Sequence, residues 1–145
     1  MVEHFEDSEL LFHRVKNVTL DGRNVPPTEI GYPGSNGMSV NRERFSLPED
    51  VLWPDCSTWG IAALSCADIR SVMEESGDGR RRFTLAPRHD PLEASMELDQ
   101  RENYAHSLII TLEDGRHDHT PPTNSVKKKI RFEIARFLRV LKRPT

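Results

Sequence analysis

The chain has 145 residues, of which 36% are hydrophobic and 30% charged, and its formal net charge is −3. This length is typical of one domain with a substantial core, and so small a net charge argues against a disordered chain. No apolar run approaches the roughly 18 residues of a membrane span, and the acidic start MVEHFEDSEL lacks the features of a secretory signal. We therefore expect a single cytosolic domain over residues 1–145.

Five short segments predict β-strands from their apolar residues, although the alternation in the first does not separate apolar from polar side chains cleanly and the fourth begins with a basic cluster. They are SELLFHRVKNV (8–18), MSVNRERFSL (38–47), WGIAALS (59–65), RRRFTLAP (80–87) and AHSLIITLEDG (105–115). Residues 20–37 concentrate Gly, Pro, Asn and Ser, which predicts a long loop between the first two strands. The charged stretch 88–103 has no clear period and is expected to be a connector.

Two helices are predicted between these strands. A proline at its start and two acids favour a short helix in LPEDVLW (47–53). Ser65 and Asp68 have the spacing of a capping box, and Gly77 can stop the helix that they begin. With the terminal helix described next, this order of elements predicts an α+β fold with a mainly antiparallel sheet.

The closing segment predicts an amphipathic helix over residues 126–143, capped by Asn124 or Ser125 and ended by Pro144. Its apolar face consists of Val126, Ile130, Ile134, Phe137, Leu138 and Leu141. Residues 126–145 hold eight Lys or Arg and one acid, so the opposite face is basic although the rest of the chain is acidic. The apolar face can complete the core while the basic face is solvated or pairs with the acidic body.

The basic face of this helix also suits a partner. Phe132 projects among the basic side chains, where its ring can stack on a base or enter a pocket of a partner. The predicted contact residues are Lys128, Phe132, Arg136, Arg139 and Arg143. We expect a protein as the partner, with nucleic acid and a membrane surface as alternatives.

Cys66 lies at a predicted helix start, where main-chain N–H groups favour a thiolate. Beside His106 it would form a Cys–His nucleophile, with Glu102 or Asp99 orienting the imidazole. The alternative is a buried, inert thiol. With only one other cysteine, Cys56, the chain has no disulfide framework, and we expect two free thiols, although their spacing permits a bridge.

His117 and His119 form an HDH sequence that puts two imidazoles on one side of an extended backbone. Together with His89, Asp90 or Cys56 they would make a zinc site. The spacing matches no standard zinc pattern, so the alternative is a pair of solvated histidines in a proline-flanked loop.

The segment LFHRV, followed after a loop by GMSVNRERF, resembles the start of ADP-ribosyltransferase-type proteins. In that fold a His or Arg on the first strand and a Ser or an aromatic residue on the second hold the nicotinamide nucleotide, and a later Glu supports transfer. The resemblance implies these roles for His13 or Arg14, for Ser39 and for Glu113. The wider pattern LFHRV, GMSV, YAHSLI also resembles short bacterial proteins of unknown function.

The chain has no Walker loop and no G-x-G-x-x-G, H-E-x-x-H or G-x-S-x-G motif. We therefore expect no cofactor, and the first hypothesis is a binding or accessory protein that acts through its basic terminal helix. The alternative is a small enzyme, either a transferase or a hydrolase. Its catalytic candidates are His13, Arg14, Ser39, Cys66 and His106. The two hypotheses differ in whether His13, Cys66 and His106 converge in one pocket.

Overall fold

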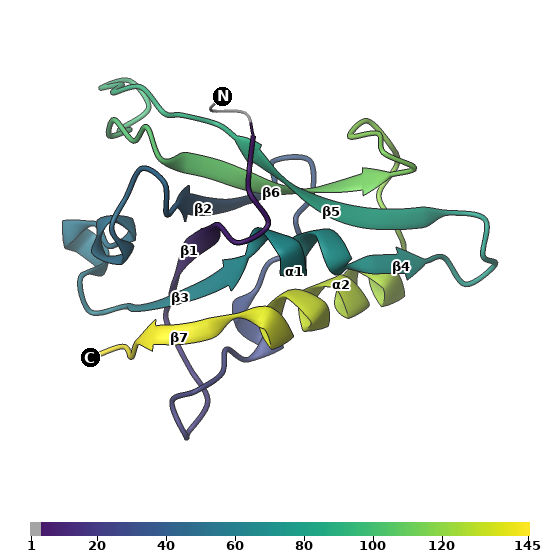
Figure 1. The fold of residues 1–145 in the computed structure, drawn as a ribbon, viewed down its shortest axis with the longest axis horizontal. Coiled ribbons are helices and arrows are strands. Elements are labelled where there is room, and N and C mark those ends of the chain that lie inside the picture. The colour runs from purple at the N-terminus through teal and green to yellow at the C-terminus, as the bar shows by residue number, and fades with distance from the viewer. Residues whose placement is uncertain (1–3) are drawn as a thin grey trace.

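One curved sheet of seven strands dominates the computed structural model, which describes residues 4–145 (Figure 1). The strands are β1 (Leu10–Val15), β2 (Met38–Arg42), β3 (Gly60–Ser65), β4 (Met73–Glu75), β5 (Arg82–His89), β6 (His106–Glu113) and β7 (Arg139–Lys142). The helices are α1 (Cys66–Ser71) and α2 (Asn124–Phe137), with short 3₁₀ turns η1 (Pro27–Glu29), η2 (Pro48–Val51) and η3 (Pro54–Cys56). The spatial order is β4-β5-β6-β2-β1-β3-β7, and every neighbouring pair is antiparallel. The predicted α+β class is confirmed.

The core lies between one face of the sheet and the two α-helices. In β1, Leu11 and Val15 point into this main core, whereas Phe12 belongs to a smaller cluster on the other face. This division follows from the period of two in a strand, which sends successive side chains to opposite faces. The helical contribution to the main core comes from Cys66, Ile69, Val126, Ile130, Ile134 and Ala135. The second face is covered only in part, by the segment around η2.

α1 begins as predicted, because the Ser65 hydroxyl accepts a hydrogen bond of 3.1 Å from the main-chain N–H of Asp68. The predicted end at Gly77 is wrong, since the helix stops at Ser71 and the chain enters β4. A turn around Gly79, whose φ is +72°, then closes the β4–β5 hairpin. As a strand, β4 pairs with the outer edge of β5. If the helix continued instead, the main-chain N–H and C=O groups at this edge of β5 would lose these partners.

The terminal helix is confirmed, but its predicted extent is wrong at both ends. Thr123 is the N-cap, with its hydroxyl 3.4 Å from the N–H of Val126, so that Asn124 and Ser125 lie inside α2. α2 ends at Phe137, and the chain continues as β7 along the outer edge of β3 (Figure 1). Here the side chains alternate in exposure instead of following a helical period. The open edge of β3 favours this outcome, because a strand there satisfies its unpaired main-chain groups.

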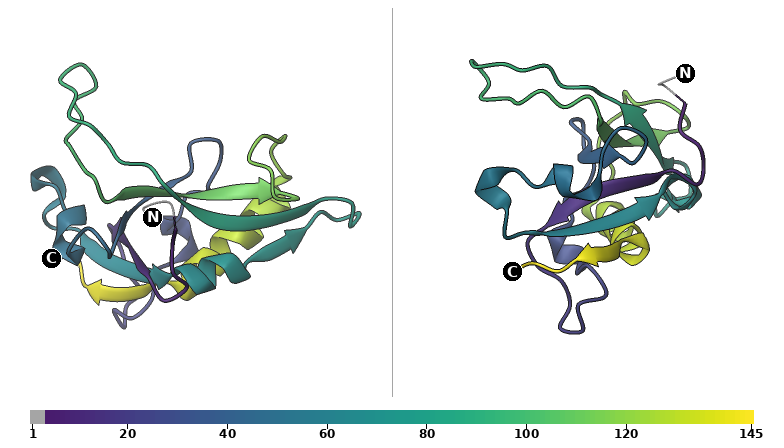
Figure 2. Two further views of the ribbon diagram at one scale, coloured as in Figure 1. Left: turned by 45° about the horizontal axis from the view of Figure 1, so that its top comes forward. Right: turned by 60° about the vertical axis from the view of Figure 1, so that its left-hand side comes forward.

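The connection between β5 and β6 extends away from the sheet as an irregular hairpin (Figure 2). Isolated bridges pair Leu92 with Asn103 and Ser95 with Gln100. The two arms of the connection therefore run side by side, and its base lies beside the sheet face that carries no α-helix. No helix within residues 4–145 combines the length and the apolar character needed to cross a bilayer.

Candidate functional site

A gap between β1 and β2 creates the site. β1 pairs with β3 along its whole length, but it pairs with β2 only at Leu11 and Phe12. Beyond Phe12 the two strands separate, and the His13 ring bridges them with Nδ1 2.8 Å from the main-chain oxygen of Ser39. A carbonyl oxygen only accepts hydrogen bonds, so His13 Nδ1 carries a proton and donates it. In the neutral ring Nε2 is then an acceptor.

His13 is held in this neutral form by its surroundings. Burial lowers the pKa of His13 below its ordinary value of 6.5, and nearby Arg14 lowers it further. The hydrogen bond to Ser39 and the charge of Glu29 act in the opposite direction but do not reverse the shift. Near neutral pH the His13 side chain is therefore uncharged, and its hydrogen bond fixes the position of the Ser39 backbone.

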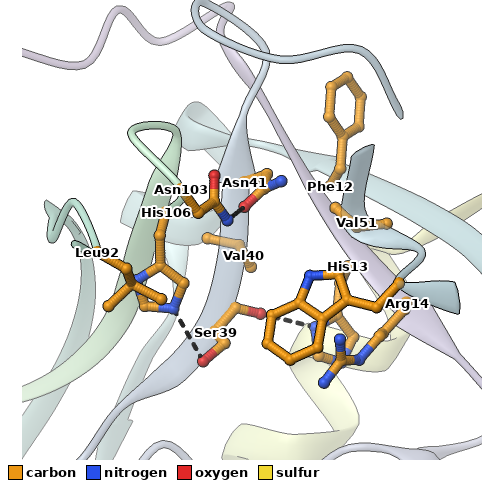
Figure 3. Close-up of a pocket in the computed structure, with 11 residues that line it drawn as sticks. Phe12, His13, Arg14, Ser39, Val40, Asn41, Val51, Leu92, Asn103 and His106 are labelled. Atoms are coloured by element: carbon orange, nitrogen blue, oxygen red, sulfur yellow. Dashed lines mark hydrogen bonds between the residues drawn. The ribbon is translucent and has the colours of Figure 1, made fainter. Parts of the chain in front are cut away.

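The gap opens into a pocket of about 190 Å³ on the face without α-helices (Figure 3). Strands β1, β2 and β6, the segment around η2 and the base of the β5–β6 connection all contribute to its wall. The lining residues are Phe12, His13, Arg14, Ser39, Val40, Asn41, Val51, Trp53, Leu92, Asn103 and His106. Four of the five predicted catalytic residues are therefore brought together, although they come from three strands.

His106 lies between a hydroxyl and a carboxylate. Its Nε2 is 3.1 Å from the hydroxyl oxygen of the exposed Ser39, the contact drawn in Figure 3. Its Nδ1 is 2.8 Å from the main-chain oxygen of Asp90 and 3.3 Å from the carboxylate of the same residue. Because both Asp90 atoms are acceptors, Nδ1 carries the proton. In the neutral ring Nε2 is then free to accept the proton of the Ser39 hydroxyl.

Two asparagines add amide donors beside this group. Asn103 donates to the side-chain oxygen of Asn41 over 2.7 Å, which ties the β5–β6 connection to β2. Among residues 4–145 the Asn41 side-chain nitrogen is buried and finds no hydrogen-bond partner. The main-chain N–H of Ser39 points toward the gap, because the N–H and C=O of one residue in an antiparallel strand face the same neighbour.

Cys66 does not join the pocket. Its side chain is fully buried in the main core, on the other side of the sheet from His106. Burial, with a further contribution from Glu9, raises the pKa of the Cys66 thiol to about 12, which disfavours a thiolate. The orienting position proposed for Glu102 or Asp99 is occupied by Asp90. Both cysteines are free thiols and are buried.

The structure places the Asp90 carboxylate beside His106, whereas the sequence predicts Asp90 only as a candidate metal ligand. Asp90 directly follows β5, and His106 begins β6. In an antiparallel hairpin these two positions lie opposite each other, next to the observed pair of His89 and Ser107. Asn41 carried a similar signal, since a single residue separates it from Ser39 and both therefore point to the same face of β2.

The other nominated residues lie elsewhere. Glu113 is at the opposite end of β6, where Arg81 binds its carboxylate through two hydrogen bonds of 3.0 and 2.8 Å. His119 lies between the main-chain oxygens of Thr111 and Thr120, and His117 faces Arg88 at 3.4 Å. Within residues 4–145 no group of three or more His, Cys, Asp or Glu side chains is arranged to hold a metal ion.

The five predicted partner-binding residues do not share one helix. Lys128, Phe132 and Arg136 are exposed on α2, whereas Arg139 belongs to β7 and Arg143 follows it. Arg136 pairs with Glu133 at 2.6 Å. Arg143 donates to the main-chain oxygen of Asp21 over 3.2 Å.

Searches against protein-family models, curated proteins and solved structures found no match to this chain.

Proposed function

We propose that this protein is a small serine hydrolase or acyltransferase, with Ser39 as nucleophile, His106 as base and Asp90 as the group that orients the base. The observation that carries the proposal is the position of His106, with one ring nitrogen 3.1 Å from the Ser39 hydroxyl and the other 3.3 Å from the Asp90 carboxylate. A nucleophile, a base and an orienting acid in this relation recur on unrelated folds, so the arrangement itself supports the proposal.

In the proposed reaction the Ser39 oxygen adds to the carbonyl carbon of an ester, and its proton passes to His106 Nε2. The Asp90 carboxylate stabilises the imidazolium that results. When the carbonyl re-forms, the bond to the leaving alcohol breaks and His106 returns its proton to that alcohol. Water then attacks the acyl-serine with His106 again acting as base, which releases the acid and regenerates Ser39.

The negative charge that develops on the carbonyl oxygen requires donors in the same pocket. The candidate donors are the main-chain N–H of Ser39 and the side-chain amides of Asn41 and Asn103. The unpartnered amide nitrogen of Asn41 supports this role, because a buried donor without a partner is costly in a folded protein. The rigid backbone of β2 places Ser39 and Asn41 on one face.

A fluorophosphonate probe tests the nucleophile directly. We expect a covalent adduct on Ser39, located by mass spectrometry of the digested protein, since the probe traps serines that a neighbouring base activates. The adduct should be absent from Ser39→Ala and retained in Ser35→Ala, which changes another exposed serine. Equal labelling of several serines, or no adduct at all, would refute the proposed nucleophile.

A second candidate function is binding of an acidic protein through the surface of α2. The observation that favours it is Phe132, whose side chain is 51% exposed with Lys128 Nζ 6.0 Å from the ring centre, although α2 buries its other face in the core. We expect the variant with Phe132, Arg136 and Arg139 changed to alanine to lose a stoichiometric partner from native cell extract. Arg80→Gln, at an exposed site on another hairpin, is the control. Identical captures would contradict this function.

A further inference from the structure

Arg14 is a cation at the pocket, held between two aromatic rings. Its guanidinium carbon lies 4.8 Å from the ring centre of Trp53 and 5.5 Å from that of Trp59, and one nitrogen is 3.9 Å from the sulfur of Cys56. Among residues 4–145 no carboxylate forms an ion pair with this half-buried side chain. The aromatic contacts orient the guanidinium but do not neutralise its charge.

Two cavities meet at this side chain. The pocket that contains Ser39 and His106 shares Arg14 and His13 with a neighbouring cavity of about 330 Å³. That second cavity also contains Lys16, whose ammonium nitrogen lies 4.9 Å from the ring centre of Trp59. The acid in its lining is Glu29, which accepts a hydrogen bond of 3.2 Å from Asn17. The lining of the second cavity therefore carries two basic side chains, Arg14 and Lys16, and one acidic side chain, Glu29.

These observations bear on the substrate class of the proposed acyl-transfer site. We propose that Arg14 recognises a carboxylate on the acyl portion of the substrate, so that the preferred substrates are half-esters of dicarboxylic acids; this inference rests on the proposed function. The planar fork of a guanidinium matches a carboxylate through two parallel hydrogen bonds. The carboxylate would enter the second cavity while the ester carbonyl lies beside Ser39. Arg14 and Ser39 lie on the separated parts of β1 and β2, so an extended acyl chain spans the gap between them.

Tryptophan fluorescence gives a binding readout that is independent of catalysis. The chain has two tryptophans, and both lie against Arg14. In Ser39→Ala, monomethyl adipate should produce a saturable change in fluorescence, whereas the uncharged dimethyl adipate should produce none. Arg14→Gln should weaken binding of monomethyl adipate at least tenfold, and Arg80→Gln should leave it unchanged. Equal affinities for the two adipates, or tighter binding of inorganic phosphate than of monomethyl adipate, would overturn the inference.

Kinetics separate failure of this inference from failure of the proposed function. The p-nitrophenyl half-ester of adipic acid has a free carboxylate, whereas methyl p-nitrophenyl adipate has a methyl ester in its place. The KM of the half-ester should be at least tenfold lower than that of the diester, and Arg14→Gln should remove this difference. Ser39-dependent turnover of both esters with the same KM would overturn the role of Arg14 and leave the hydrolase intact. Fluorescence-detected binding of monomethyl adipate without Ser39-dependent turnover would retain the carboxylate site and refute acyl transfer.

Discussion

His106→Ala is expected to lower kcat for an activated ester by about three orders of magnitude, within the range for loss of a positioned general base. The reason is that Ser39 would retain its hydroxyl but lose the only acceptor placed to take its proton in the proposed mechanism. Steady-state hydrolysis of the adipate half-ester measures the change. A variant that kept the wild-type rate would exclude His106 as the base.

The combination of His106→Ala with Ser39→Ala distinguishes a catalytic unit from two independent effects. Residues that act together in one step are strongly non-additive, so the double variant should be about as slow as either single variant. His117→Ala is the matched control, because it removes an exposed imidazole outside the pocket and should leave kcat unchanged. Circular dichroism and thermal unfolding show whether each variant retains the fold.

Leu138→Ala is expected to reduce the free energy of unfolding by about 3 kcal/mol, within the range for truncation of a buried leucine. Leu138 is fully buried at the junction of α2 and β7, where it packs in the main core. Urea denaturation measures the loss.

Leu141→Ala is the matched control, since this side chain is 51% exposed on β7 and its removal should change the free energy of unfolding by less than about 0.5 kcal/mol. The pair also tests where the helix ends. A helix continuing through residue 141 would place both leucines on its apolar face, so comparable losses in the two variants would contradict the strand.

Much of the fold could be predicted because local patterns report local structure. The alternation of β1, the apolar run of β3 and the cap at Ser65 each depend on neighbours in sequence, and each was recognised. The end of α2 was not, because the segment after Phe137 fits both a helical and a strand period. The open edge of β3 decides between them, and that edge exists only after the sheet has formed.

The candidate site likewise combines residues that the sequence predicts with contacts that only the folded sheet creates. His13, Arg14, Ser39 and His106 were nominated from residue chemistry and from a family resemblance, and the structure places all four around one pocket. Cys66 was nominated with equal local justification but faces the core. The contact between Asp90 and His106 was not predicted, because it depends on the register of the β5–β6 hairpin.

The sequence by itself determined the α+β class, five of the seven strands and the start of α1, since side-chain patterns and helix caps are properties of neighbouring residues. Only the tertiary structure decided that β1 and β2 separate beyond Phe12, that Ser39 contacts His106 and His106 contacts Asp90, and that residues 139–142 form an edge strand. The physical reason is that strand partners and registers are long-range contacts, chosen by burial and main-chain pairing across the whole sheet.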